Sequence, residues 1–443
     1  MAKFIPRFCL IMLICFAIAT LFVIFNFKSQ PADPIHYPRR PEDTKVDCAR
    51  LFAGDNEYAK KIASKRPILV PNEKLNLSCR AIRSRVLPPR NANSTFPIAF
   101  VKVVFTDYEF LEEQLAFTYS EENWYCFAPD KKATSLFRSR FRALAACLPN
   151  VLLSESEYNL DSSGHFMNHA HFDCLRQLAA KPWKYVILMQ NHDVMIKSNA
   201  ELVHIFQLLN GSNDWELIRC PNGLCKDSLG TNLGKLGICP NGFSQNQTKS
   251  CEKASLSWGK GNNEMSLSRQ TVDFLLSRIN FTLLMEELNG MKYGVDEILV
   301  HTIAVSPELR LPGGFTSKCL VNGSEVKANM HWHVTRLSHW SHLHEHCGSG
   351  QWRHKICIFG VEDLPFLEDS AYVMANKLMP SVDYAAISCI GEMLLNRSID
   401  GLEAHPLKMH IYTGLQQVRF DRERSANPHF DARNFLCEVP KAY

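Results

Sequence analysis

The sequence predicts an α/β protein with a mostly parallel β-sheet and helices on both faces, preceded by a transmembrane helix and a stem. Between residues 97 and 193, apolar segments of strand length alternate with segments of helical spacing. This alternation is typical of a parallel sheet covered on both faces. The N-terminal elements are indicated by a long uncharged apolar segment and by the Pro-rich, charged residues that follow it.

The apolar segment covers residues 8–25, FCLIMLICFAIATLFVIF. Its 18 residues reach the lower limit for crossing a bilayer and exceed the core of most cleaved signal peptides. Lys3 and Arg7 precede it, which favours a cytosolic N-terminus. We therefore expect four parts. They are a cytosolic tail at 1–7, an uncleaved signal anchor at 8–27, a stem at 28–95 and a lumenal catalytic domain at 96–443.

Cysteines and glycosylation sequons also favour a lumenal body. Of the 16 cysteines, Cys9 and Cys15 lie in the apolar segment, and the rest would be a hazard in an oxidising compartment unless most were paired. Seven N-x-S/T sequons, taken together with the anchor, indicate passage through the secretory pathway. Their asparagines are Asn76, Asn93, Asn210, Asn246, Asn280, Asn322 and Asn396.

The body opens with four expected strands and three expected helices. The strands cover residues 97–106, 123–130, 150–156 and 183–193, and the helices cover residues 107–120, 131–148 and 168–180. Ligands bind beyond the carboxyl ends of the strands in such sheets, where Asp130 and Asp193 fall. For each aspartate taken alone, capping of the next helix is an equally good interpretation.

Residues 211–258 are less regular and contain Cys220, Cys225, Cys239 and Cys251 among Gly, Asn and Ser. We interpret them as a loop region tied by disulfides. Zinc is an alternative by residue type, but the Cys220–Cys225 gap is wider than the usual structural-zinc spacing, and thiols oxidise in this compartment. The net charge of +4 is too small to indicate a nucleic-acid partner.

Two adjacent carboxylates, Asp296 and Glu297, follow a Tyr-Gly turn at the head of an apolar segment. Acids in a first helical turn satisfy free N–H groups and face the positive end of the helix dipole. One aspartate is enough for that role, so the second acid is a candidate for chemistry.

Three blocks resemble the core 2/I-branching β-1,6-N-acetylglucosaminyltransferase family, which also includes the peptide O-xylosyltransferases. They are RHKICIFGVEDLPFLEDSAYVMANKL (353–378), GKGNNEMSLSRQTVDFLL (259–276) and YGVDEILVHTI (293–303). The spacing of Cys126, Cys147 and Cys174 also fits three family cysteines. The resemblance covers about residues 48–400.

The resemblance implies a glycosyltransferase-A-type fold in a type II Golgi membrane protein. It implies an inverting enzyme that uses a UDP-sugar donor and a glycan or glycoprotein acceptor, with N-acetylglucosamine in β-1,6 branching as the expected transfer. Xylosyl or glucosyl transfer on the same architecture and a catalytically inactive glycan-binding protein remain alternatives. Four disulfides are also implied, namely Cys48–Cys389, Cys79–Cys147, Cys126–Cys174 and Cys347–Cys357.

Inverting transfer needs a base that takes the acceptor hydroxyl proton, and a carboxylate suits this role. The resemblance assigns it to Glu297 and leaves Asp296 as a helix cap or a group that positions the acceptor. The chain has no Asp-x-Asp motif, so we expect no divalent metal or other cofactor, and fixed cations must stabilise the departing diphosphate.

The resemblance places two basic residues at the diphosphate. Lys377 matches the Lys of the family's ANK block. The family's Arg falls on His354, in a loop one residue longer than usual, so Arg353 is our candidate because a guanidinium grips phosphate bidentately. Asp130 matches a family Asp on the nucleotide side. Trp332 lies near the family's acceptor-stacking Trp, although a core Trp is the better interpretation there.

Six histidines lie between residues 331 and 346. A His-rich segment can bind metal, but H-E-x-x-H is absent and the spacings fit no standard ligand set. We interpret them as surface and acceptor-groove residues.

Overall fold

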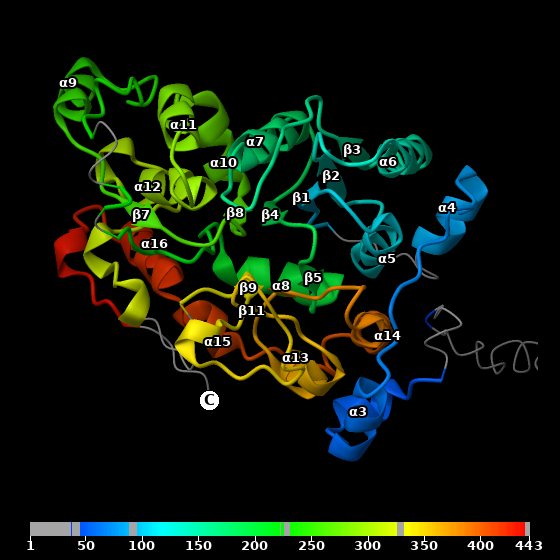
Figure 1. Ribbon diagram of the computed structural model, residues 1–443. Coiled ribbons are helices and arrows are strands. Elements are labelled where there is room, and N and C mark those ends of the chain that lie inside the picture. Colours follow the sequence, from blue (N-terminus) through cyan, green and yellow to red (C-terminus); the bar gives the residue numbers. More distant parts are fainter. Residues whose placement is uncertain are drawn as a thin grey trace, which may run out of the picture. The chain divides into compact units, whose positions relative to one another are not determined.

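The computed structural model describes residues 37, 45–87, 95–221, 223–225, 231–325 and 332–438 (Figure 1). The chain divides into two units, 1–38 and 39–443, and the second contains the elements below. The expected cytosolic tail and signal anchor, and the sequon residue Asn93, lie outside the described residues. A search of the helices that are described finds none long and apolar enough to span a bilayer.

A five-stranded sheet forms the centre of the second unit, in the order β3-β2-β1-β4-β8 (Figure 1). The first four strands are parallel, and β8 is antiparallel to β4. Their bounds are β3 Val151–Leu153, β2 Trp124–Pro129, β1 Ile98–Val104, β4 Tyr185–Met189 and β8 Ser266–Ser268. The mostly parallel sheet and its four expected strands are therefore confirmed.

The central strand β1 is buried along its whole length. Val101 and Val103 belong to the apolar core that also contains Phe172 of α7 (Met167–Leu178). Phe100 and Lys102 line the opposite face beneath α5 (Tyr108–Thr118). Because side chains alternate along a strand and both faces are covered, the strand is apolar at almost every position.

Short sheets surround the central one. They are β5-β12-β9, β6-β7 and β10-β11. Their bounds are β5 Val194–Met195, β12 Met374–Ala375, β9 Arg336–Leu337, β6 Ile218–Arg219, β7 Gly259–Lys260, β10 Trp352–Arg353 and β11 Ile356–Cys357.

The remaining helices are distributed along the whole described chain. They are α2 Cys48–Phe52, α3 Asn56–Ala63, α4 Cys79–Val86, α6 Ser135–Cys147, α8 Asn199–Leu209, α9 Gln245–Lys253, α10 Arg269–Ser277, α11 Thr282–Asn289, α12 Leu299–Val305, α13 Leu364–Asp369, α14 Tyr384–Asp400, α15 Met409–Gly414 and α16 Gln416–Ala426. A 3₁₀ turn, η1 (Val295–Glu297), precedes α12.

Hydroxyl side chains, and not the strand-end aspartates, cap the helices after β2 and β5. Thr134 accepts a hydrogen bond from Phe137 N at the start of α6, and Ser198 forms a capping box with Glu201 at the start of α8. These are preferred capping residues. Capping therefore does not account for Asp130 or Asp193.

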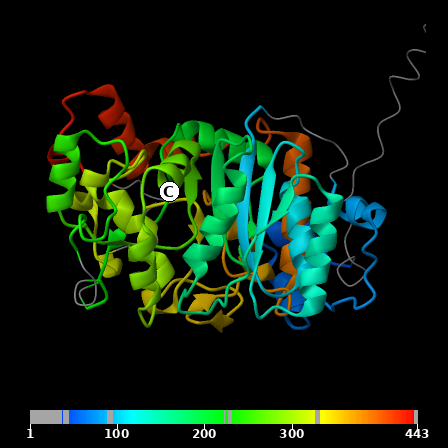
Figure 2. The same ribbon diagram turned by 90° about the horizontal axis from the view of Figure 1, so that it is seen from above.

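The folded unit begins well before residue 96, inside the expected stem. Helices α2 to α4 pack against the body, and two disulfides, Cys48–Cys389 and Cys79–Cys147, tie them to α14 and α6. Figure 2 shows these N-terminal helices beside the C-terminal segment that carries α14. Since the Pro-rich, charged composition ends near residue 45, the stem signal does not extend over 45–87.

Seven disulfides join the fourteen described cysteines. Four are those implied by the resemblance. The others are Cys220–Cys225, Cys239–Cys251 and Cys319–Cys437. The disulfide interpretation of residues 211–258 is therefore confirmed, and the zinc alternative is excluded there. The six sequon asparagines within the described ranges are all exposed.

Candidate active site

The adjacent carboxylates lie in η1, a short turn held against the loop before α7. Gly294, with φ of +69°, precedes the turn, and its N–H donates to the carbonyl of Ser163 at 2.9 Å. A left-handed φ favours glycine. The Tyr-Gly turn of the sequence therefore fixes the direction in which both acids leave the backbone.

Glu297 is the more accessible acid, with 24% of its side chain exposed. Lys260 of β7 donates a hydrogen bond from Nζ to Glu297 Oε2. The backbones are joined as well, because Gly261 N donates to the carbonyl of Glu297 at 3.0 Å. This carboxylate is therefore held by a cation on one side and accessible to solvent, as a base for an incoming hydroxyl requires.

Asp296 is buried, and its Oδ2 accepts a hydrogen bond of 2.6 Å from Asn263 Nδ2. It packs so closely on Gly164 that a Cβ there would lie 1.9 Å from Oδ1. Burial first, and then the charge of Glu297, raise the pKa of Asp296 to about 6. Asp296 is not a helix cap, since Gly294 is the N-cap of η1 and no side chain caps the turn. The two acids therefore have different environments, one buried and one accessible.

A cluster of three cations, Lys377, Arg336 and Arg353, forms a second part of the site. Burial, and then the charges of Arg336 and Arg353, lower the pKa of Lys377 to about 8. Lys377 is fixed beside β11, since its N–H donates to Cys357 O at 3.3 Å and its carbonyl accepts from Phe359 N at 2.9 Å. Lys377 and Arg336 are largely covered, whereas Arg353 is exposed. Cations gathered in this way are suited to a bound diphosphate.

Arg353 and His354 lie on a tight hairpin. Arg353 pairs with Ile356 across β10 and β11, so His354 and Lys355 form a two-residue turn. Their φ values are +50° and +67°, as a type I′ turn requires. Arg353 Nη1 reaches Met379 Sδ at 3.7 Å, next to the strand end that carries Lys377. The hairpin thus places Arg353 on β10 and His354 in the turn.

Arg336 was missed by sequence reasoning, because no motif marks it. It is buried and donates from Nη2 to Asn376 Oδ1 at 2.8 Å and from Nη1 to Asn262 Oδ1 at 3.0 Å. Nη1 also lies 3.2 Å from Glu264 Oε2. Asn376 in turn donates to Asp193 at 2.7 Å. Asp193 therefore belongs to the hydrogen-bond network of Arg336 and Asn376, shortly after β4 of the central sheet ends.

One polar segment, residues 259–264, joins the two parts of the site. Lys260 and Asn263 bind the two acids, while Asn262 and Glu264 contact Arg336. The same six residues therefore contact both acids and one cation of the cluster, Arg336. The sequence signal for this segment is the polar run 262–264, which follows Gly259 and Gly261 and precedes the buried strand β8.

Asp130 and Trp332 lie outside these contacts as far as the described residues show. Asp130 is buried at the end of β2, and its Oδ1 accepts from Lys132 N at 2.8 Å. Trp332 is half-buried, and its Nε1 has no hydrogen-bond partner in the described part of the chain. Neither placement decides the role expected from the resemblance.

The described histidines of the 331–346 segment do not converge. His333 contacts the carbonyl of Arg336 at 3.1 Å, and His339 Nδ1 contacts the carbonyl of His346 at 2.5 Å. Within the described ranges no group of three His, Cys, Asp or Glu side chains is arranged to hold a metal ion.

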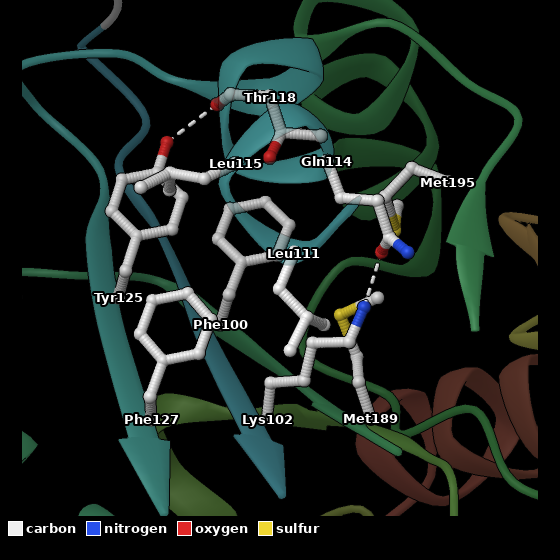
Figure 3. A pocket seen from close by; sticks show the side chains of 10 residues that line it. All are labelled: Phe100, Lys102, Leu111, Gln114, Leu115, Thr118, Tyr125, Phe127, Met189 and Met195. Atoms are coloured by element: carbon white, nitrogen blue, oxygen red, sulfur yellow. Dashed lines mark hydrogen bonds between the residues drawn. The ribbon is translucent and has the colours of Figure 1, made fainter. Parts of the chain in front are cut away.

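A small cavity beneath α5 lies apart from this site (Figure 3). Its volume is about 30 Å³, and it is lined mainly by apolar side chains of the sheet and α5. Lys102 enters it and donates to Gln114 Oε1 and, at 2.8 Å, to the carbonyl of Asp193. The cavity has room for water but not for a sugar nucleotide.

Comparisons with known proteins agree with the geometry. The sequence profile named Branch, the Core-2/I-Branching enzyme family, matches residues 98–367. A beta-1,3-galactosyl-O-glycosyl-glycoprotein beta-1,6-N-acetylglucosaminyltransferase of Bovine herpesvirus 4 (strain LVR140) is 26% identical over 405 residues, covering 85% of this chain and 89% of the viral protein. The Homo sapiens protein of the same description is 26% identical, covering 81% of this chain and 87% of its own.

Among solved structures, the mannosyltransferase Ktr4p from S. cerevisiae in complex with GDP is 12% identical. It covers 63% of this chain and 79% of its own, with a TM-score of 0.25. That likeness is too low to support an argument. The family profile, by contrast, spans more than half of the chain and includes the acid pair, the segment 259–264 and Arg353. The chain therefore belongs to the Core-2/I-branching family of glycosyltransferases.

Proposed function

We propose that this protein is an inverting, metal-independent glycosyltransferase that moves a sugar from a UDP-sugar to a glycan acceptor. N-acetylglucosamine in β-1,6 linkage is the proposed transfer, since the relatives are named for it. The proposal includes the glycosyltransferase-A-type fold and a type II Golgi membrane topology, on the strength of the apolar N-terminal segment, the disulfides and the exposed sequons.

In the proposed reaction Glu297 accepts the proton of the acceptor hydroxyl as its oxygen attacks the anomeric carbon. The bond between that carbon and UDP breaks on the opposite side. Lys377, Arg353 and Arg336 offset the charge that develops on the diphosphate, which is the role a metal ion plays in many sugar transferases. Asp130 is proposed to hold the uridine, and Trp332 and Asp296 to shape the acceptor side.

The observation that carries the proposal is that residues 259–264 contact both the acid pair and Arg336. The non-enzymatic alternative rested on the altered arginine position. The charge of Arg353 acts on Lys377, and His354 lies in the turn, which supports Arg353 as the arginine of an active site.

The test is a donor panel with the full-length protein in detergent. UDP-N-acetylglucosamine, UDP-xylose and UDP-glucose are each supplied with mucin-type glycan acceptors in EDTA, and product linkage is read by mass spectrometry. Transfer of N-acetylglucosamine in EDTA supports the proposal, and transfer of another sugar corrects the donor. Glycan binding without transfer from any donor would support the inactive alternative.

A further inference from the structure

Lys260 is held against Glu297 by its own backbone. Gly261 N donates to the carbonyl of Glu297, and Gly259 N donates to Thr302 Oγ1 of α12 at 3.3 Å. A Cβ on Gly261 would lie 1.9 Å from the carbonyl oxygen of Glu216. A Cβ on Gly259 would lie 2.8 Å from the carbonyl oxygen of His301 in α12. The strand that carries Lys260 is therefore packed between α12 and the backbone of Glu216 more closely than residues with side chains permit, and this fixes its position beside the turn that carries Glu297.

The contact between the two side chains is specific to one oxygen. Lys260 Nζ donates to Oε2 of Glu297. Within the described ranges no residue donates to Oε1, and 24% of the Glu297 side chain is exposed. Lys260 itself is mostly covered, with 18% of its side chain exposed, so solvent weakens this ion pair less than a surface pair.

We propose that Lys260 is a positioning residue for the base. It holds Oε2 and so turns Oε1 toward the acceptor hydroxyl. This inference rests on the proposed function, because it assigns a partner to the proposed base. In the transfer step the proton passes to Oε1, the acceptor oxygen bonds to the anomeric carbon, and UDP leaves with the electrons of the broken bond.

Several other titratable groups face the pair. Burial lowers the pKa of Lys260, but the charge and hydrogen bond of Glu297 raise it. The charges of Glu216 and Tyr293 raise it further, and the net effect is a raised pKa. Burial, and then the charge of Lys260, lower the pKa of His301 to about 3, so His301 stays neutral through an assay. The charge of Glu297 raises the pKa of Asp296 and that of Lys260 lowers it. Asp296 in turn raises the pKa of His165 and of Glu264.

The test compares pH profiles of kcat/KM for the full-length protein and its Lys260→Met variant. Without the ammonium, the carboxylate of Glu297 loses the positive charge that favours its ionised form, so the acid limb moves up by roughly 1 pH unit. Lys260→Arg keeps the charge and leaves the limb near its original position. Because Asp296 also titrates near pH 6, the profiles are repeated in an Asp296→Asn background.

Lys292→Met is the matched control, since Lys292 is exposed on the loop that leads to Glu297. A merely structural role for Lys260 would lower Tm and kcat without moving the acid limb. A folded Lys260→Met variant with an unmoved limb overturns the inference and leaves the proposed function intact.

A second readout does not depend on turnover. In protein labelled with carboxyl-13C glutamate, the Glu297 signal is assigned by its loss in Glu297→Gln. Its titration moves to higher pH in Lys260→Met if the positioning role is right, and stays in place if it is wrong. A moved titration without transfer from any donor would instead contradict the proposed function.

Discussion

Arg353 and His354 are neighbours in the chain, but their side chains have different surroundings. The charge of Arg353 acts on Lys377 and His192, which places it in the cation cluster. His354 occupies a turn position with positive φ. Both residues are exposed, so at the scale of the residue the hairpin turn and the charge acting on Lys377 favour Arg353 as the arginine of the proposed diphosphate site.

We expect Arg353→Ala to lower kcat/KM by about 10²–10³, the usual effect of removing a preorganised charge-stabilising donor. His354→Asn should stay within about twofold of the original protein, because asparagine tolerates a left-handed φ. Steady-state kinetics at varied UDP-sugar concentration measure both. A large loss in His354→Asn with a mild effect of Arg353→Ala would reverse the assignment.

At this scale the sequence indicated some residues and not others. Glu297 and Lys377 stand in motifs, so their positions could be read from the sequence. The choice of Arg353 depended on the positive φ angles of His354 and Lys355, and neither residue type indicates such an angle in the sequence. Arg336 has no motif, and its importance comes from Asn262 and Asn376, which lie far from it in the chain.

At the scale of the element, residues 259–264 are the most constrained segment of the site. The segment begins as β7, packs on α12 and continues to β8. Its glycines allow a close approach that places Lys260 and Asn263 on the two acids.

Gly261→Ala should destabilise the protein by about 1–3 kcal/mol, because its Cβ meets a backbone oxygen that has little room to shift. Transfer should fall as well, because a shift of Gly261 disturbs its hydrogen bond to the carbonyl of Glu297. Gly323→Ala is the control, as its Cβ would meet only Ile218 Cδ1 at 3.5 Å. Tm and kcat/KM are measured for both, and equal effects of the two substitutions would contradict this account.

The central strands and helices were predictable because burial on both faces leaves a strong pattern. The long apolar runs of β1 and β4 and the helical spacing of α5 and α7 carry that signal. Two-residue strands such as β9 and β12 carry no periodicity, so the small sheets around the site were not foreseen. Asp296 and Glu297 were expected in the first turn of a helix, whereas they lie in the 3₁₀ turn η1. A turn of three residues also carries no periodicity that the sequence could show.

At the scale of the whole molecule, the disulfides join distant parts of the chain. Cys48–Cys389 spans 341 residues, whereas Cys220–Cys225 spans 5. In the chain-entropy picture a longer closed loop removes more freedom from the unfolded chain.

Replacing Cys48 and Cys389 by Ser should lower the free energy of unfolding by about 5 kcal/mol, and replacing Cys220 and Cys225 by about 2 kcal/mol. Tm measurements on full-length variants in detergent compare the two. A larger loss from the short loop would contradict the entropic argument.

Lys102 gives the stability a pH dependence. Burial lowers its pKa to about 7 from an ordinary value of 10.5. Between these values the unfolded chain binds the proton and the folded protein does not, so this residue makes stability rise with pH. Below pH 7 both states are protonated and the full cost of burying the charge remains.

Lys102→Met removes this contribution. The difference in Tm between the variant and the original protein should therefore shift in favour of the variant as pH falls from 9 to 6. Thermal unfolding at several pH values measures the difference, and Lys292→Met serves as an exposed control. Parallel Tm curves for Lys102→Met and the original protein would show that Lys102 is not the titrating group.

The most direct measurement compares UDP binding and sugar transfer in Glu297→Gln. Since Gln keeps the shape but not the charge, calorimetry should find UDP affinity within about twofold of the original in EDTA. Transfer should fall by about 10²–10⁴, the usual contribution of a general base. Sustained transfer by Glu297→Gln, or loss of UDP binding together with transfer, would contradict a base at Glu297 acting beside a separate set of fixed cations.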